Sequence, residues 1–184
     1  LPIEKLLKAL RYFALQQGKA WSATDLSRYA RISAPTLQRL IPAYEALFLL
    51  RRVEAIGDIK KDRFFHEDQG LASFLVREME TERDLLRLLF SQCFAQMRYL
   101  YPHEGVVQTY ETRAGARVPL VLDVNGEKTG LIPIAAESPD ASALAGAQSF
   151  LTRFPQARVA ILTRGKQVVP MGHRIFAIPF RAAF

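Results

Sequence analysis

The 184-residue sequence has little of several features that would identify whole classes of protein. It has one cysteine, so no disulfide can form within the chain, and a reducing compartment is favoured over a secreted disulfide scaffold. Cys93 lies among apolar neighbours, which favours a packed thiol. The longest apolar runs, such as LIPIAA, fall far short of the roughly 20 residues of a membrane helix, and no signal-like segment opens the chain. We therefore expect a cytoplasmic protein without a membrane partner.

Groups that carry common enzyme chemistry are also scarce. The three histidines, His66, His103 and His173, are too widely separated for the spacing of metal ligands. No Ser/His/Asp or Cys/His arrangement stands out in the sequence. The sequence therefore predicts no catalytic residues, no metal site, no cofactor and no small-molecule substrate.

What the chain does have is apolar content and positive charge. At 49% hydrophobic it can bury the core of one domain or of two small ones. The net charge is +7, and residues 1–65 hold twelve Lys and Arg against six Asp and Glu, whereas residues 66–100 hold four against six. A basic N-terminal part favours nucleic acid through counterion release, although basic soluble surfaces are nearly as common. The opening Leu1, where a start methionine would stand, is what a piece of a longer polypeptide would show.

Three short helices are predicted near the N-terminus. The first spans about 2–17, and the second spans about 23–30 with Ser22 as its N-cap. The third starts near Ser33 and is expected to kink at Pro42, which removes one helical hydrogen bond. Its apolar stripe consists of Leu37, Leu40, Ile41, Tyr44, Leu47 and Phe48.

This order, followed by LLRRVEAIGDIKKDRFFHED, predicts a winged helix-turn-helix domain over residues 1–66. In such a fold the third helix presents its outward residues to a DNA groove, and the wing supplies cations to the phosphates. The candidate DNA-binding residues are Thr36, Gln38, Arg39, Arg51, Arg52, Lys60 and Lys61. A winged helix that only packs against protein is an equally open alternative.

Residues 67–184 predict a second domain, an α/β sandwich with one mixed sheet, which makes the whole chain α+β. A helical pattern over 68–100 gives way at Val106 to strands, among them a hairpin around Asn125-Gly126. A further helix starts near Ser138, and its expected inner stripe is Leu144, Ala147, Leu151 and Phe154.

The order of the segments SAPTLQRLIPAYEALFLLRRV, RFFHEDQGLASFL and YETRAGARVPLVLDVNGEKTGLIPI resembles the C-terminal region of a bacterial and archaeal family of AAA-type P-loop ATPases. In that family a winged helix is followed by a domain of unknown function that resembles PD-(D/E)XK nucleases. The resemblance covers nearly the whole chain and rests on segment order. It implies an upstream ATPase core as a partner. This chain has no G-x-x-x-x-G-K-[ST] motif, so we do not expect it to bind ATP through a P-loop by itself.

The same resemblance implies that the nuclease site is inactive. The family hairpin reads like G-A-E-V-D-F-V-L and L-I-P-I-E-V-K, whereas this chain has GARVPLVL and LIPIAAE. Pro119 and Ala135 stand in place of acids, Glu137 in place of the lysine, and Ser91 in place of a helical glutamate. Divalent cations need such oxygen ligands, so we expect this chain not to be an enzyme.

The hairpin register is left open by the sequence. A two-residue Asn-Gly turn would place Asp123 opposite Lys128 as an ion pair, whereas the family alignment would place Pro119 opposite Ala135. The preferred hypothesis is a non-catalytic module of an ATPase that binds DNA. The alternatives are a protein-interaction module that regulates the ATPase, and a divergent metal-dependent nuclease that uses acids such as Asp123.

Overall fold

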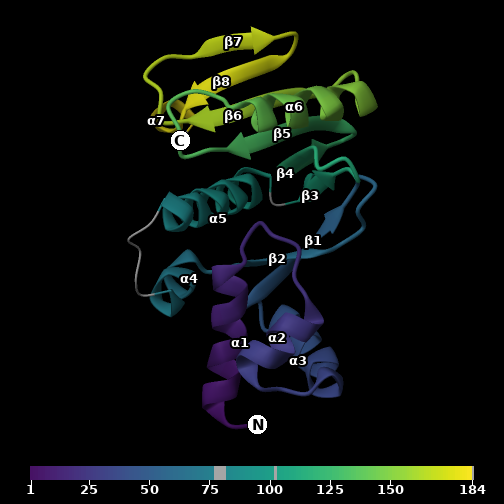
Figure 1. The fold of residues 1–184 in the computed structure, drawn as a ribbon, viewed down its shortest axis with the longest axis vertical. Coiled ribbons are helices and arrows are strands. Elements are labelled where there is room, and N and C mark those ends of the chain that lie inside the picture. Colours follow the sequence, from purple (N-terminus) through teal and green to yellow (C-terminus); the bar gives the residue numbers. More distant parts are fainter. Residues whose placement is uncertain (77–81, 102, 184) are drawn as a thin grey trace. The chain divides into compact units, whose positions relative to one another are not determined.

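The computed structural model describes residues 1–76, 82–101 and 103–183. For residues 82–88 it describes the main chain only. Its described residues form a mixed α+β protein with seven helices and a mixed sheet of eight strands (Figure 1). The chain divides into two compact units. The first unit comprises Leu1–Val53 and Lys61–Ala95, and the second comprises Glu54–Lys60 and Gln96–Phe184. This division differs from the expected boundary at residue 66, because each unit includes a segment on the other side of it.

Helices dominate the first unit, and each predicted N-terminal helix is present. The elements are α1 (Ile3–Leu15), α2 (Ala23–Ala30), α3 (Ala34–Ala46), β1 (Leu50–Ala55), β2 (Arg63–His66), α4 (Gln69–Leu75) and α5 (Glu82–Leu100), with β1 and α5 continuing into the second unit. The predicted cap is confirmed, since Ser22 Oγ accepts a hydrogen bond from Asp25 N at 3.3 Å. β1 and β2 pair antiparallel, and an isolated bridge joins Ala20 to Arg63.

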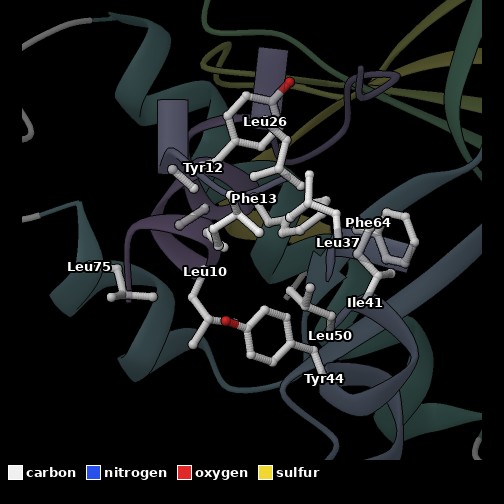
Figure 2. Packing of buried hydrophobic residues seen from close by; sticks show 14 of the residues in the cluster. Leu10, Tyr12, Phe13, Leu26, Leu37, Ile41, Tyr44, Leu50, Phe64 and Leu75 are labelled. Atoms are coloured by element: carbon white, nitrogen blue, oxygen red, sulfur yellow. The ribbon is translucent and has the colours of Figure 1, made fainter. Parts of the chain in front are cut away.

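The core of the first unit is built from the inner faces of α1, α2 and α3 and from the hairpin. The Phe13 ring lies at its centre, 5.1 Å from the Phe64 ring and 5.9 Å from the Trp21 ring between centroids. Figure 2 shows the packing of Leu10, Tyr12, Phe13, Leu26, Leu37, Ile41, Tyr44, Leu50, Phe64 and Leu75. The Tyr44 hydroxyl donates to the Leu6 carbonyl at 2.8 Å, which ties the end of α3 to the start of α1.

The apolar stripe predicted for α3 is only partly buried. Leu37, Ile41 and Tyr44 are buried, but the side chains of Leu47 and Phe48 are 67% and 70% exposed. The helix runs through Pro42 and ends at Ala46, after which Phe48 takes a left-handed backbone conformation with φ of 55°. The predicted burial of Leu47 and Phe48 was wrong because both residues lie beyond the end of the helix.

The second unit is a mixed sheet with α6 packed on β4, β5 and β6 (Figure 1). Its elements are β3 (Gly105–Glu111), β4 (Arg117–Val124), β5 (Glu127–Pro133), α6 (Ala141–Arg153), β6 (Arg158–Thr163), β7 (Val169–Gly172), β8 (Ile175–Pro179) and α7 (Phe180–Ala183). The end of β1 is followed by β3-β4-β5-β6-β8-β7 in hydrogen-bonding order. β3, β4 and β5 are antiparallel neighbours, β6 runs parallel to β5, and β7 ends the sheet as a strand interrupted by Pro170.

The hairpin of β4 and β5 has the two-residue Asn-Gly turn. Val124 pairs with Glu127, and Asp123 pairs with Lys128, with which it also forms an ion pair. Asn125 and Gly126 both have positive φ, at 52° and 90°, as a tight hairpin turn of this kind requires. The longer loop implied by the family alignment is therefore not formed.

Helix α6 starts where the sequence predicts, because Asp140 Oδ1 accepts from Ala143 N at 2.7 Å. Its buried face differs from the predicted stripe and consists of Ala143, Gly146, Ala147 and Phe150, whereas Leu144, Leu151 and Phe154 are partly buried. The stripe was predicted from large apolar residues, but small residues let the helix approach the sheet more closely. A Cβ on Gly146 would lie 2.3 Å from the Arg117 carbonyl oxygen in β4.

Replacing Gly146 by alanine is expected to lower the free energy of unfolding by about 2 kcal/mol, because the new methyl group meets main chain that cannot rotate away. In an open helix the same change would stabilise by about 1 kcal/mol, so the sign of the effect tests the close approach. Urea denaturation measures it. Ala145→Gly at the neighbouring exposed position is the control and should cost about 1 kcal/mol through helix propensity alone. A stabilised Gly146→Ala protein would contradict the packing described.

Candidate nucleic-acid interface

The N-terminal half of α3 carries polar side chains that face solvent. Leu37 is 2% exposed and anchors the helix to the core, so that the two following residues, Gln38 and Arg39, project outward and are exposed. The helix starts after Ser33, whose Oγ lies 2.9 Å from Thr36 Oγ1 in a hydrogen bond. In the part of the chain that the structure describes, no ion pair involves Arg39. Its guanidinium is therefore available for an external partner.

Arg51, a predicted phosphate ligand on β1, is already paired with a carboxylate of the chain. It donates from Nε to Glu67 in an ion pair. A phosphate would have to compete with this partner, although exposed pairs of this kind contribute only about 0–1 kcal/mol each. Arg51 is therefore less available to an external anion than Arg39 is.

Arg52, also predicted as a phosphate ligand, is held by two carboxylates and a ring. Its Nη2 donates to Glu45 Oε2 at 2.9 Å, and its Nη1 donates to Asp62 Oδ2 at 3.0 Å. Its guanidinium carbon also lies 5.2 Å from the centroid of the Phe64 ring. The hydrogen bond to Glu45 raises the pKa of Arg52 above its usual value. Arg52 therefore links the end of α3 to the hairpin, and most of its donors are already used within the chain.

The structure assigns the last two predicted residues to different units. Lys61 is exposed and belongs to the first unit, whereas Lys60 belongs to the second. The loop before Lys60 is attached to β3, since Ile56 N donates to Thr109 O at 2.8 Å and Ile59 N donates to Glu111 O at 3.1 Å. Six of the seven predicted residues thus lie in the first unit, whereas Lys60 lines a depression in the second unit.

The residues that the family resemblance aligns with the nuclease site do not form a set of metal ligands. Pro119 is buried in β4, Ala135 is 6% exposed, and Glu137 is exposed to solvent. Ser91 is buried, and its Oγ has no hydrogen-bond partner. Within the described residues, no three or more His, Cys, Asp or Glu side chains are placed so that they could hold a metal ion.

Cys93 and His66 are buried in the first unit and have strongly shifted pKa values. Burial raises the pKa of the Cys93 thiol to about 12, and the expectation of a packed thiol is confirmed. Burial lowers the pKa of His66 to about 4, so its ring is neutral near pH 7. His66 Nε2 donates to the Leu10 carbonyl oxygen at 3.1 Å, which fixes the tautomer with the proton on Nε2. Both side chains serve packing and not an exposed site.

A depression of about 580 Å³ lies in the second unit and was not predicted from the sequence. Its charged lining residues are Lys60, Arg113, Arg153 and Asp58, and only Lys60 was singled out from the sequence. Asp58 and Arg113 are 55 residues apart, yet Arg113 N donates to Asp58 Oδ2 at 3.4 Å. No short motif could have revealed a cluster that depends on pairing between β1 and β3.

Comparison with known proteins yields no match to this chain among protein-family models, curated proteins or solved structures. None of the described helices has the length and apolar character needed to cross a bilayer. What the chain does is therefore inferred from its own geometry.

Proposed function

We propose that the first unit is a winged helix that binds duplex DNA through α3. The order of α1, the bridging residue Ala20, α2, α3 and the hairpin of β1 and β2 supports this assignment. The isolated bridge from Ala20 to Arg63 places one residue of the segment between α1 and α2 beside the hairpin. This order positions α3 with its inner side on the core and its other side in solvent.

The observation that carries the proposal is the pair of exposed side chains, Gln38 and Arg39, on the outward side of α3. In a major groove, arginine can donate two hydrogen bonds to guanine, and glutamine can pair with the edge of adenine. An α-helix of this diameter fits that groove. Lys61 and the partly neutralised Arg51 and Arg52 would add contacts to the phosphates at the edge of the site.

For the second unit we propose an inactivated nuclease-like domain that no longer catalyses cleavage. The succession of three antiparallel strands, α6 and the parallel strand β6 supports a fold of that type. Pro119 and Ala135, both apolar and buried, support the loss of activity. Together the two units would act as a C-terminal module beside an AAA-type ATPase core. Plasmid cleavage by the purified protein in Mg²⁺ or Mn²⁺ would contradict the proposed inactivity.

The DNA proposal predicts that Arg39→Ala weakens duplex binding about tenfold or more, because one groove contact of this kind contributes about 1–3 kcal/mol. Arg51→Ala should weaken binding less, since that guanidinium is already paired with Glu67. Fluorescence anisotropy with labelled duplexes measures both variants over a range of salt concentrations, and wild-type affinity should fall as salt rises. Arg164→Ala, which removes one exposed charge from the second unit, serves as the matched control.

Equal weakening by Arg39→Ala and Arg164→Ala would show that only overall charge matters and would remove α3 as the contact. Failure to bind any duplex at low salt would overturn DNA binding altogether. In that case a winged helix that binds protein takes its place, an alternative that the exposed apolar pair Leu47 and Phe48 favours. Capture of the ATPase core in the absence of nucleic acid would then support that alternative.

A further inference from the structure

We propose that the depression in the second unit is a binding site for phosphate groups. It lies where the loop 56–60, the turn after β3 and the end of α6 meet, and it involves none of the residues on α3. The ligand class is a phosphate anion, supplied either by a small phosphorylated molecule or by the backbone of a nucleic acid. The site does not depend on DNA binding by the first unit.

The shape of the depression is fixed by main chain. Ile56 N and Ile59 N are hydrogen-bonded to β3 on either side of Gly57, and Gly57 runs so close to that strand that a Cβ there would lie 2.1 Å from the Glu111 carbonyl oxygen. Only glycine can follow the strand at this distance. The hydrogen bond from Arg113 N to Asp58 Oδ2 then joins the loop to the turn after β3. The site is therefore formed before any ligand arrives.

The charge of the lining favours an anion. Lys60, Arg113 and Arg153 face one carboxylate, that of Asp58, so the charged lining has a formal excess of two positive charges. Asp58 is already an acceptor for the Arg113 main chain. Among the described residues, no ion pair joins any of these three cations to an acidic side chain. Lys60 Nζ donates one hydrogen bond, to the Ala55 carbonyl oxygen at 3.4 Å, and its ammonium has two further donors for a ligand. Two negative charges on a ligand would balance the excess.

The remaining polar groups of the lining hold the walls in place. The Tyr110 hydroxyl lies 2.9 Å from Ser149 Oγ in a hydrogen bond, and Thr112 Oγ1 accepts from Ala116 N at 3.2 Å.

Arginine suits phosphate because its planar guanidinium can donate two parallel hydrogen bonds to the oxygens. A volume of about 580 Å³ lies within the range of small-molecule sites, and it exceeds what a single phosphate group fills. The ligand is thus expected to extend beyond the phosphate itself.

Isothermal titration of the full chain with pyrophosphate, and separately with a short duplex, tests the proposal. The variants are Lys60→Gln, Arg113→Gln and Arg153→Gln, all at exposed positions, with Arg164→Gln as a control that removes the same charge outside the site. Each site variant is expected to weaken binding about tenfold, whereas the control should leave it unchanged. Thermal unfolding midpoints equal to that of the wild type would establish that the variants fold.

The titrations with pyrophosphate and with the duplex together identify the source of the phosphate. Pyrophosphate binding that the site variants weaken assigns the site to small phosphorylated molecules, while weakening of duplex binding alone assigns it to nucleic acid. If neither ligand distinguishes the site variants from Arg164→Gln, the proposal is overturned. If duplex binding depends on Arg39 and Arg113→Gln weakens neither duplex nor pyrophosphate binding, this site is overturned while the function proposed for α3 stays intact. The two proposals can therefore fail separately.

Discussion

Replacing Phe13 by alanine is expected to lower the free energy of unfolding of the first unit by about 3–5 kcal/mol. The Phe13 side chain is 1% exposed, and its ring contacts the rings of Tyr12, Trp21 and Phe64 with centroid separations of 5.7, 5.9 and 5.1 Å. Alanine would leave a cavity among side chains that come from α1, from the segment before α2 and from β2. Because these elements support α3, the variant should also lose the proposed DNA binding near its lowered unfolding midpoint.

Chemical denaturation followed by the fluorescence of Trp21, the single tryptophan of the chain, measures this loss directly. The matched control is Ile3→Ala on the same helix, where the side chain is 71% exposed and the change should alter stability by less than about 0.5 kcal/mol. A loss below about 1 kcal/mol for Phe13→Ala would mean that the ring is not central to the core.

Acidification from pH 7 to pH 4 is expected to remove roughly 3 kcal/mol of stability through His66 alone. Burial lowers the pKa of this histidine from 6.5 to about 4 in the folded protein, with the nearby Asp68 carboxylate opposing the shift only partly. The unfolded chain therefore binds the proton first as the pH falls. The contribution is fully present above pH 6.5 and decreases progressively toward pH 4.

Unfolding free energies of wild type and His66→Phe, measured at several values from pH 7.5 to pH 4, isolate this effect from the titration of carboxylates that both proteins share. The variant loses the hydrogen bond to the Leu10 carbonyl and should be less stable at pH 7, but its stability should depend less on pH. His103→Gln and His173→Gln change exposed histidines and should keep the wild-type profile. Parallel profiles for wild type and His66→Phe would disprove the role of His66.

Features that depend on neighbouring residues were predictable from the sequence. Ser22 was predicted as a cap, and the helix that was expected to start near Ser138 begins after Asp140. Both side chains accept main-chain hydrogen bonds within the next turn. Asn125 and Gly126 mark the hairpin because they adopt positive φ at low cost, and the ion pair of Asp123 with Lys128 follows from that turn.

Features that depend on distant residues were not predictable in the same way. The buried face of α6 depends on how closely Gly146 approaches β4. The spacing of apolar residues along the sequence does not show this distance. For the candidate interface, the sequence placed Arg39 on the outward side of α3, but it could not show that Arg51 is paired with Glu67, 16 residues away. The phosphate site needs the loop at Gly57 to attach to β3 before its three cations meet.

The position of Pro170 in β7 has a consequence for self-association. Strand β7 is the last of its sheet, and an unpaired terminal strand ordinarily offers a continuous row of amide donors to another polypeptide. Proline has no amide hydrogen, and the register shifts between Pro170 and Gly172, so that row is broken within a strand of four residues. Addition of another strand at this edge of the sheet is therefore less favourable than at an uninterrupted strand.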